Sequence, residues 1–327
     1  MTRPLLQRKE AGIYCEAGDF YIDPQQPVDR ALVTHAHMDH ARPGHNTTIC
    51  SAHTARLLKI RLGESVTTET WGTGEAHQLG DVRVSLHPAG HILGSCQVRI
   101  ETEAGEVWVY SGDYTPYPDP SCEPFEPLPC DTFVSECTYG LPLYSWPEPG
   151  EEYAALRAWW EENQKNGYTT VVFTYALGKA QRLLHALTSC RSPIGAHGSI
   201  RSMLPAYEEA GVSFPEVMPV NKDTQSTLRG NGLVVAPAST DESTWLKKVS
   251  PYATASASGW MRIRGQRRRM GVDRGFVLSD HADWPGILNT IRQTGAKRVG
   301  LVHGNGETLA RWLQEMQDPP VEECFLL

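Results

Sequence analysis

The chain has 327 residues, of which 40% are hydrophobic and 21% are charged, with a mean hydropathy of −0.38 and a formal net charge of −8. These values predict a globular protein with one large domain or two ordinary ones, and the acidic balance argues mildly against a broad nucleic-acid-binding surface. No apolar run approaches the roughly 20 residues of a membrane helix, and the N-terminus does not read as a signal peptide, so we expect no membrane association.

The first 145 residues are predicted to be rich in strands. Runs of β-branched residues that end in a turn or a polar loop predict strands over residues 31–35, 81–87, 96–102 and 106–113. Residues 51–63 predict a helix that begins at the N-cap Ser51 and ends at Gly63. A proline-rich stretch over residues 119–150 then predicts long loops or a crossing between domains.

Strands and helices alternate after residue 150. The pattern predicts helices over residues 151–167, 178–189 and 202–211, and strands over residues 168–176, 192–200 and 232–239. The chain ends with a strand and loop over residues 275–284, a helix over 286–295, a strand over 298–304 and a helix over 305–316. This rhythm predicts an α/β fold with a parallel sheet, and a middle block of about 130 residues that could form its own domain.

Polar side chains gather where the predicted strands end. Three histidines and an aspartate follow the first strand within six residues, and similar side chains follow later strands. The candidates are His35, His37, Asp39, His40, His91, Asp113, Glu136, His281 and His303. Because ligands bind at the carboxyl ends of strands in open α/β sheets, we expect these side chains to share one site.

The residue types at these positions predict a metal site. Imidazole and carboxylate suit a borderline divalent ion such as zinc, and the absence of thiolate favours a catalytic over a structural site. The eight cysteines form no C-x-x-C pair and predict reduced, mostly buried thiols of a cytoplasmic protein. Seven of the nine candidates are counted as metal donors: His35, His37, Asp39, His40, His91, Asp113 and His303. Seven donors exceed one tetrahedral ion and suit two ions that share a carboxylate. Two ions about 3.5–4 Å apart can clamp a phosphoryl or carbonyl oxygen.

The H-x-H-x-D-H run over residues 35–40 resembles the hallmark of the metallo-β-lactamase superfamily. The segments "AGHILGS" and "YSGDYT", which contain His91 and Asp113, look like its next two metal motifs in order and spacing. The resemblance implies an αββα sandwich with a dinuclear zinc site at one edge. It also implies that Asp23, in "FYIDP", supports the metal ligands from behind.

Further segments resemble the β-CASP nucleases of that superfamily. "SECTYG", with Glu136, looks like their E-S-T-Y-G motif with Cys137 in place of the serine. "LSDHADW", with His281, and "GLVHG", with His303, resemble their motifs B and C. "ALGKAQRLL" and "TASASGWM" are similar to segments near the start and the end of the β-CASP insert.

This resemblance implies a domain plan for nearly the whole chain. We predict a metallo-β-lactamase domain in two parts, over residues 1–147 and 275–327, with an inserted β-CASP α/β domain over residues 148–274. The motif set looks closest to bacterial exonucleases associated with DNA ligases, which are relatives of the Artemis-like repair nucleases. It therefore implies a zinc-dependent 5′→3′ exonuclease of single-stranded DNA or DNA ends in DNA repair, with an ATP-dependent DNA ligase and a helicase as partners.

The superfamily pattern also implies a role for each site residue. Two Zn²⁺ ions are expected, with Mn²⁺ as a substitute, one at His35, His37 and His91 and the other at Asp39, His40 and His303, with Asp113 bridging them. His281 is expected to protonate the leaving 3′ oxygen. Glu136 is expected to hydrogen-bond that imidazole and favour its charged form.

An arginine-rich stretch just before motif B predicts a contact with nucleic acid. Residues 261–274 contain six arginines and one aspartate, although such a run can also be only a solvated face. The predicted contacts are Ser258, Gly259, Arg262 and Arg264, together with Lys179 at the start of a helix.

The sequence leaves three other functional interpretations open. A β-CASP ribonuclease that processes RNA ends is the first, because a motif-C histidine is shared with the RNA enzymes. A small-molecule hydrolase of the glyoxalase or lactamase kind is disfavoured by the insert and the motif-B histidine. A non-catalytic nucleic-acid-binding scaffold is disfavoured because all seven ligand positions and the expected acid are present.

Overall fold

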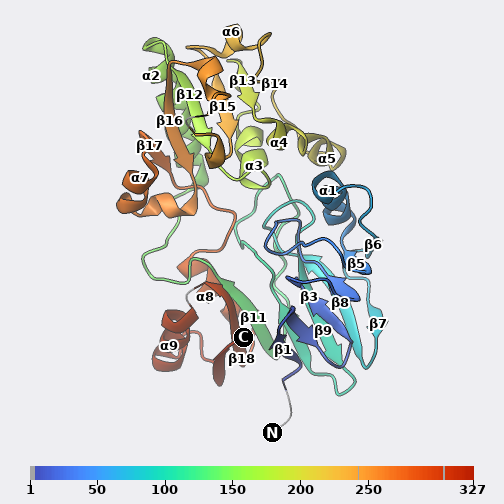
Figure 1. The fold of residues 1–327 in the computed structure, drawn as a ribbon. Helices are drawn as coiled ribbons and strands as arrows, with labels where there is room; N and C mark the ends of the chain where they lie inside the picture. The colour runs from blue at the N-terminus through green and yellow to red at the C-terminus, as the bar shows by residue number, and fades with distance from the viewer. Residues whose placement is uncertain (1–3, 242, 305) are drawn as a thin grey trace. The chain divides into compact units, whose positions relative to one another are not determined.

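The computed structural model describes residues 4–241, 243–304 and 306–327, and the chain divides into two compact units. Unit 1 comprises Met1–Ser145 and His281–Leu327, and unit 2 comprises Trp146–Asp280 (Figure 1). The assignment of residues 148–274 to an inserted β-CASP domain remains a prediction.

Unit 1 contains two sheets and three longer helices. The first sheet has the order β1 (Leu6–Lys9), β2 (Gly12–Cys15), β3 (Phe20–Ile22), β4 (Arg30–Leu32), β5 (Thr47–Cys50) and β6 (Thr68–Thr70). The second has the order β19 (Glu323–Leu326), β18 (Arg298–Gly304), β11 (Thr132–Cys137), β10 (Val107–Tyr110), β9 (Cys96–Thr102), β8 (Val82–Pro88) and β7 (His77–Leu79). The helices are α1 (Ala52–Leu62), α8 (Trp284–Thr294) and α9 (Gly306–Met316).

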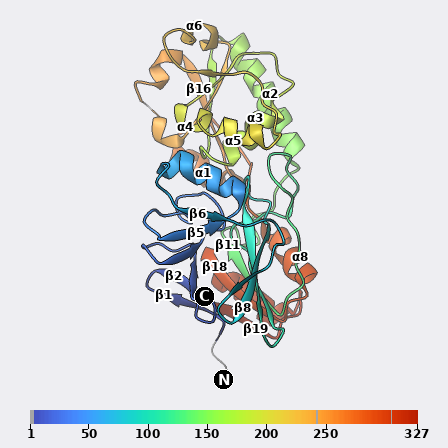
Figure 2. The same cartoon turned by 90° about the vertical axis from the view of Figure 1, so that its right-hand side faces the viewer.

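Alternation along the strands explains how these sheets form layers. On β10, Trp108 and Tyr110 join the core shared with the first sheet, whereas Val109 joins the core shared with α8 and α9. Successive strand residues point to opposite faces, so one strand can serve both cores. Figure 2 shows α8 on the side of the second sheet that faces away from the first. With α1 beside β6, these layers are consistent with the expected αββα sandwich, and the predicted α/β fold class is confirmed.

Unit 2 is built around a parallel sheet. Its order is β14 (Val217–Pro219), β13 (Ile194–Ala196), β15 (Leu233–Ala236), β12 (Thr169–Phe173), β16 (Tyr252–Ala257) and β17 (Arg274–Phe276). Every pairing between its described strands is parallel. All five residues of β12 are buried, as expected for a parallel sheet that is covered on both faces.

Helices and short turns cover both faces of this sheet. Val172 packs with residues of the longer helices, whereas its neighbours Val171 and Phe173 belong to a second core on the opposite face. The helices of unit 2 are α2 (Pro149–Lys165), α3 (Lys179–Ala186), α4 (Gly198–Arg201), α5 (Leu204–Glu209), α6 (Gln225–Leu228) and α7 (Arg264–Met270). Short 3₁₀ turns are η1 (Ala238–Thr240), η2 (Leu246–Val249) and η3 (Gly259–Arg262).

Most elements agree with the sequence pattern, and the differences have local causes. The Ser51 side chain accepts from the Thr54 backbone N–H, so α1 begins where predicted. The strand predicted over residues 192–200 was too long. It ends at Ala196, because the His197 side chain caps α4 by accepting from the Ser199 N–H. In the described part of the chain, no helix is both long and apolar enough to cross a membrane.

Candidate metal centre

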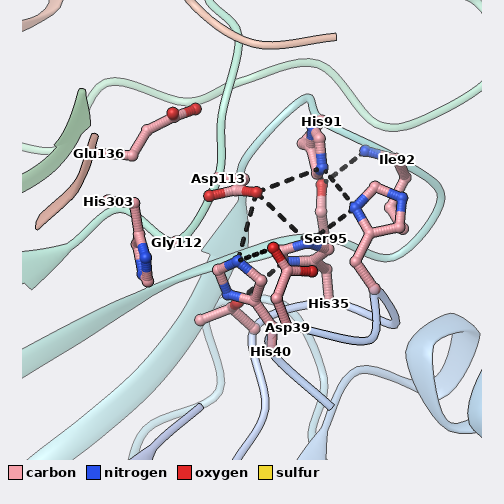
Figure 3. Close-up of polar contacts among 12 residues, drawn as sticks. His35, Asp39, His40, His91, Ile92, Ser95, Gly112, Asp113, Glu136 and His303 are labelled. Carbon is pink, nitrogen blue, oxygen red and sulfur yellow. Dashed lines mark hydrogen bonds and ion pairs between the residues drawn. The ribbon is translucent and has the colours of Figure 1, made fainter. Parts of the chain in front are cut away.

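Four side chains of unit 1 converge on one point. His35 and His37 lie in the loop after β4, His91 lies in the β8–β9 connection, and Asp113 follows β10. Figure 3 shows His35, His91 and Asp113 pointing toward one another. Nδ1 of His37 lies 3.1 Å from Nε2 of His35 and 3.0 Å from Nε2 of His91. Oδ2 of Asp113 lies 3.6 Å and 3.7 Å from the same two Nε2 atoms.

This spacing is that of ligands around one metal ion. One donor atom from each of the four residues lies within 4.8 Å of the others. Four ligands placed about 2.1 Å from a tetrahedral Zn²⁺ would lie about 3.4 Å apart, close to the distances found here. These are the residues expected for the first ion with the shared Asp113, and that assignment stays a prediction.

A buried oxygen without a partner supports the same conclusion. Asp113 is 5% exposed, and among the described residues its Oδ1 atom has no hydrogen-bond partner. An unsatisfied buried carboxylate oxygen is costly, and a bound cation would remove that cost. Asp113 therefore fits the role of a carboxylate shared between two ions.

One ligand expected for a second ion approaches the same oxygen of Asp113. Nε2 of His40 is 3.3 Å from Oδ2 of Asp113 and 3.9 Å from Oδ2 of Asp39. The ring centroids of His40 and His303 are 4.9 Å apart. This set is looser than the first, because the Asp39 side chain is 78% exposed and Nε2 of His303 lies 3.1 Å from the Tyr110 hydroxyl.

An irregularity in the sheet directs His303 to this place. On β18, Val302 pairs with Glu136 and Gly304 pairs with Cys137, so His303 is the extra residue of a β-bulge. Its φ is +49°, a left-handed conformation that histidine adopts more readily than β-branched residues do. Gly304 follows at φ +117°, where a Cβ atom would collide with the Cys137 carbonyl oxygen.

Buried residues behind the ligands hold their rings. Oδ2 of Asp23 lies 2.7 Å from Nδ1 of His40 and accepts from the Thr34 hydroxyl at 2.7 Å, while its Oδ1 accepts from the Thr34 N–H. The Thr34 hydroxyl also lies 3.0 Å from Nδ1 of His35. Such contacts leave Nε2 of each ring to face a metal ion. The sequence predicted Asp23 as a support but missed Thr34, which carries no motif signal.

The electrostatic surroundings differ from one ring to the next, and the two buried carboxylates make the pocket favourable for positive charge. Burial and neighbouring imidazoles lower the pKa of His35 well below its usual value, so this ring is neutral and can coordinate. Burial also acts to lower the pKa of His40, but the carboxylates of Asp113 and Asp23 outweigh it and raise that pKa. Burial acts to raise the pKa of Asp113, and His40 outweighs it, so Asp113 is a carboxylate. The pocket is thus an anionic environment that stabilises positive charge.

A histidine–carboxylate pair lies beside the ligands. Nδ1 of His281 is 2.9 Å from Oε1 of Glu136 and 4.0 Å from Oδ2 of Asp113. Glu136 is fully buried, and it accepts from the Tyr114 N–H at 3.1 Å and from the Thr138 hydroxyl at 2.5 Å. These bonds fix the carboxylate, which in turn orients the imidazole.

The five residues predicted to contact nucleic acid belong to unit 2. Arg262 and Arg264 are exposed, and Ser258 caps η3 by accepting from the Trp260 N–H. Lys179 is only 6% exposed, and its ammonium pairs with the buried carboxylate of Asp280. This ion pair could not be foreseen, because its partner lies 101 positions along the chain.

The chain is similar to known proteins over nearly its whole length. It is 32% identical over 305 residues to a "probable DNA ligase" of Opitutus terrae, which covers 93% of this chain and 30% of that protein. It is 29% identical over 200 residues to a ribonuclease of Thermus thermophilus, over 51% of this chain and 44% of that protein. The chain therefore spans less than half of the length of these curated relatives. No protein-family model matches the chain.

The fold has a counterpart among solved structures. A protein of unknown function from Enterococcus faecalis matches with a TM-score of 0.61 and 13% identity, over 91% of this chain and 79% of that chain. At this identity the match bears on the fold alone. From its motif-bearing loops, its layered α/β fold and its curated relatives, we conclude that the chain belongs to the β-CASP family of the metallo-β-lactamase superfamily.

Proposed function

We propose that this protein is a zinc-dependent 5′→3′ exonuclease of single-stranded DNA that acts in DNA repair. The observation that carries the proposal is the position of Asp113. One of its oxygens faces the imidazoles of two ligand sets, and the other is buried without a partner among the described residues. A carboxylate in this position suits a pair of divalent ions.

The candidate ligands divide into two sets, one for each proposed ion. One ion would be bound by His35, His37, His91 and Asp113, and a second by Asp39, His40, His303 and Asp113. When bound, these ions supply Lewis acidity toward the phosphoryl oxygens and activate water. Imidazole and carboxylate donors suit Zn²⁺, and Mn²⁺ can take the same ligands.

His281 and Glu136 would supply the proton for the leaving group. Glu136 accepts a hydrogen bond from Nδ1–H of His281 and stabilises the protonated ring, so Nε2–H can donate to the leaving 3′ oxygen. Because the Tyr114 and Thr138 bonds hold Glu136, the imidazole is oriented before substrate binds. A fixed acid of this kind favours cleavage over mere binding, which argues against a scaffold role.

The choice of DNA rests on one relative. A segment similar to 93% of this chain forms part of a longer protein named as a DNA ligase. A nuclease that trims DNA ends prepares substrates for ligation, so we also propose an ATP-dependent DNA ligase as a partner. A helicase partner remains a prediction from the sequence resemblance.

A ribonuclease is the second candidate, and a different observation favours it. The Thermus thermophilus relative is named a ribonuclease, and its match covers 51% of this chain. The described residues do not reveal which of them would contact a 2′-hydroxyl, the group that distinguishes RNA from DNA.

A competition in one tube tests the proposal. Metal-loaded protein is mixed with a DNA strand and an RNA strand of the same sequence, each 5′-phosphorylated and carrying a different 3′ dye. A ladder of shortened DNA with intact RNA supports the proposal, whereas loss of RNA alone moves the protein to RNA processing. If the wild type and the Asp39→Ala variant leave both strands intact to the same extent, the proposed activity is wrong.

A further inference from the structure

Unit 2 contains a cavity of about 550 Å³ at the carboxyl ends of its parallel strands. Its walls come from the segments that follow three strands and from one short helix. They include Thr174 and Tyr175 after β12, Ser258 and Trp260 after β16, and Gln266 and Met270 of α7. The volume lies within the roughly 300–1,000 Å³ of small-molecule sites.

The topology of the sheet favours a ligand at this position. From β12 the chain moves to β13 and β14 on one side, returns to β15, and then crosses to β16 and β17 on the other side (Figure 1). In open α/β sheets, ligands bind outside the carboxyl ends of the strands where the direction of strand order changes. The cavity lies beside β12, at that change of direction.

Exposed aromatic rings border the cavity. Tyr175 is 60% exposed and Trp260 is 38% exposed. Two large aromatic rings are exposed to water at the same cavity. Covering them with a ligand would remove apolar surface from water, which favours binding here. Flat rings of this kind are the platforms on which nucleobases stack, whichever base is present.

The Tyr175 ring is held in place by a buried lysine. Nζ of Lys179 lies 4.6 Å from the centroid of the Tyr175 ring, and the same ammonium pairs with the buried Asp280 carboxylate. Lys179 is therefore fixed at both contacts, and it fixes the ring through a cation–π interaction. A ring that is already oriented loses less conformational freedom when a ligand binds.

Positive charge lies next to the cavity. The helix α7 buries none of its residues, and its arginines together with one from η3 are all exposed: Arg262, Arg264, Arg267, Arg268 and Arg269. Within the described residues, none of these guanidinium groups has an ion-pair partner within 4.0 Å. Gln266 and Met270, one turn apart on α7, face the cavity. One helix thus joins the apolar cavity to a cationic surface in a chain with net charge −8.

We propose that this cavity is a base pocket, which receives one unpaired nucleobase of a single strand against Tyr175 and Trp260 while the α7 arginines contact the flanking phosphates. This inference rests on the proposed function and adds the form of the substrate. A base that is paired and stacked within a duplex cannot enter such a pocket, so the pocket selects single strands. Lys179 acts here as a positioning residue for Tyr175, and not as a phosphate ligand.

A binding experiment with two kinds of strand tests the base pocket. Full-length protein in EDTA, where hydrolysis is absent, is titrated against a dye-labelled 15-mer of thymidylate and against a 15-mer of the same backbone whose sugars carry no base. Fluorescence anisotropy gives each Kd. The variant is Tyr175→Ala, and the matched control is Tyr168→Ala. Tyr168 is 43% exposed and directly precedes β12. It therefore lies at the amino end of that strand, whereas the cavity lies at the carboxyl end.

We expect Tyr175→Ala to weaken thymidylate binding by about 5- to 140-fold and to leave the abasic strand unchanged. Tyr168→Ala should change neither. Equal Kd values of wild type and Tyr175→Ala for the thymidylate strand would overturn the base pocket. Equal weakening for both strands would also overturn it, because the loss would then not involve the base.

A third arm separates this inference from the proposed function. A uridylate 15-mer binds more tightly than thymidylate if RNA is the substrate, and the Tyr175→Ala effect then persists on RNA. That result supports the base pocket and contradicts the DNA preference. An inactive protein that still loses base-dependent binding in Tyr175→Ala likewise supports the pocket and contradicts the proposed hydrolysis.

Discussion

The His40 ring is held between two carboxylates, with Nδ1 2.7 Å from Oδ2 of Asp23 and Nε2 3.3 Å from Oδ2 of Asp113. Both carboxylates are buried, and Asp23 is also fixed by the backbone N–H and the hydroxyl of Thr34. One nitrogen is therefore used for support and the other is directed at the metal centre. Contacts run from Thr34 through Asp23 and His40 to Asp113, so we expect metal affinity to depend also on residues that would not touch the metal.

We expect Asp23→Asn to weaken metal binding by about 10- to 100-fold, because the amide can donate to Nδ1 and favour the wrong tautomer of His40. Competition with a chromophoric chelator measures the affinity. The exposed Asp29 offers a control, and Asp29→Asn should leave the affinity unchanged. An affinity of Asp23→Asn equal to that of the control would show that this support is dispensable.

Asp39→Ala is expected to lower turnover by about 10³-fold or more, because the variant would lack a charged ligand proposed for the second ion. The Asp39 side chain is 78% exposed, so removing it should leave the midpoint of thermal unfolding of the metal-free protein within about 2 °C. Steady-state hydrolysis of a labelled strand and a thermal melt measure the two effects. Near-wild-type turnover would contradict the assigned ligand set.

His281→Ala is expected to lower kcat by about 10²- to 10⁴-fold while metal content stays at the wild-type level. Glu136→Gln should reduce kcat less, because the amide keeps the shape but not the charge that stabilises the protonated ring. Single-turnover kinetics and elemental analysis measure both properties. His53→Ala is the control, since that half-buried ring lies 3.6 Å from Glu123 and outside the site. Loss of metal from His281→Ala would make this residue a ligand instead of an acid.

The double variant Arg262→Gln, Arg264→Gln should reduce the salt dependence of single-strand binding. Each phosphate contact contributes a slope of about −0.7 in a plot of log K against log salt, so the slope should become less negative by about 1.4. Anisotropy titrations between low and physiological salt measure it. Arg191→Gln, an exposed arginine of the same unit, is the matched control. An unchanged slope in the double variant would indicate that these arginines form only a solvated face.

The sequence by itself determined the local features. The limits of α1 follow from Ser51 and Gly63, because capping is decided within one turn of helix. The parallel sheet of unit 2 follows from the alternation of strand and helix segments in the sequence. Its strands are buried on both faces, so they appear in the sequence as nearly continuous hydrophobic runs that are simple to recognise. The H-x-H-x-D-H run marks metal chemistry because four donors within six residues have no use in a core.

Only the tertiary structure decided how distant residues combine. The first sheet consists of strands of three or four residues, which are too short to show a clear alternation of apolar and polar residues. The sequence pattern therefore does not predict most of these strands. The bulge that directs His303 depends on its pairing with β11, and the Lys179–Asp280 pair joins residues far apart in the chain. The same is true of Asp113, whose carboxylate was visible in the sequence but whose buried, unpartnered oxygen exists only because the strands around it pack together. Local signals depend on neighbours in the chain, whereas burial and convergence depend on contacts that form only when the chain folds.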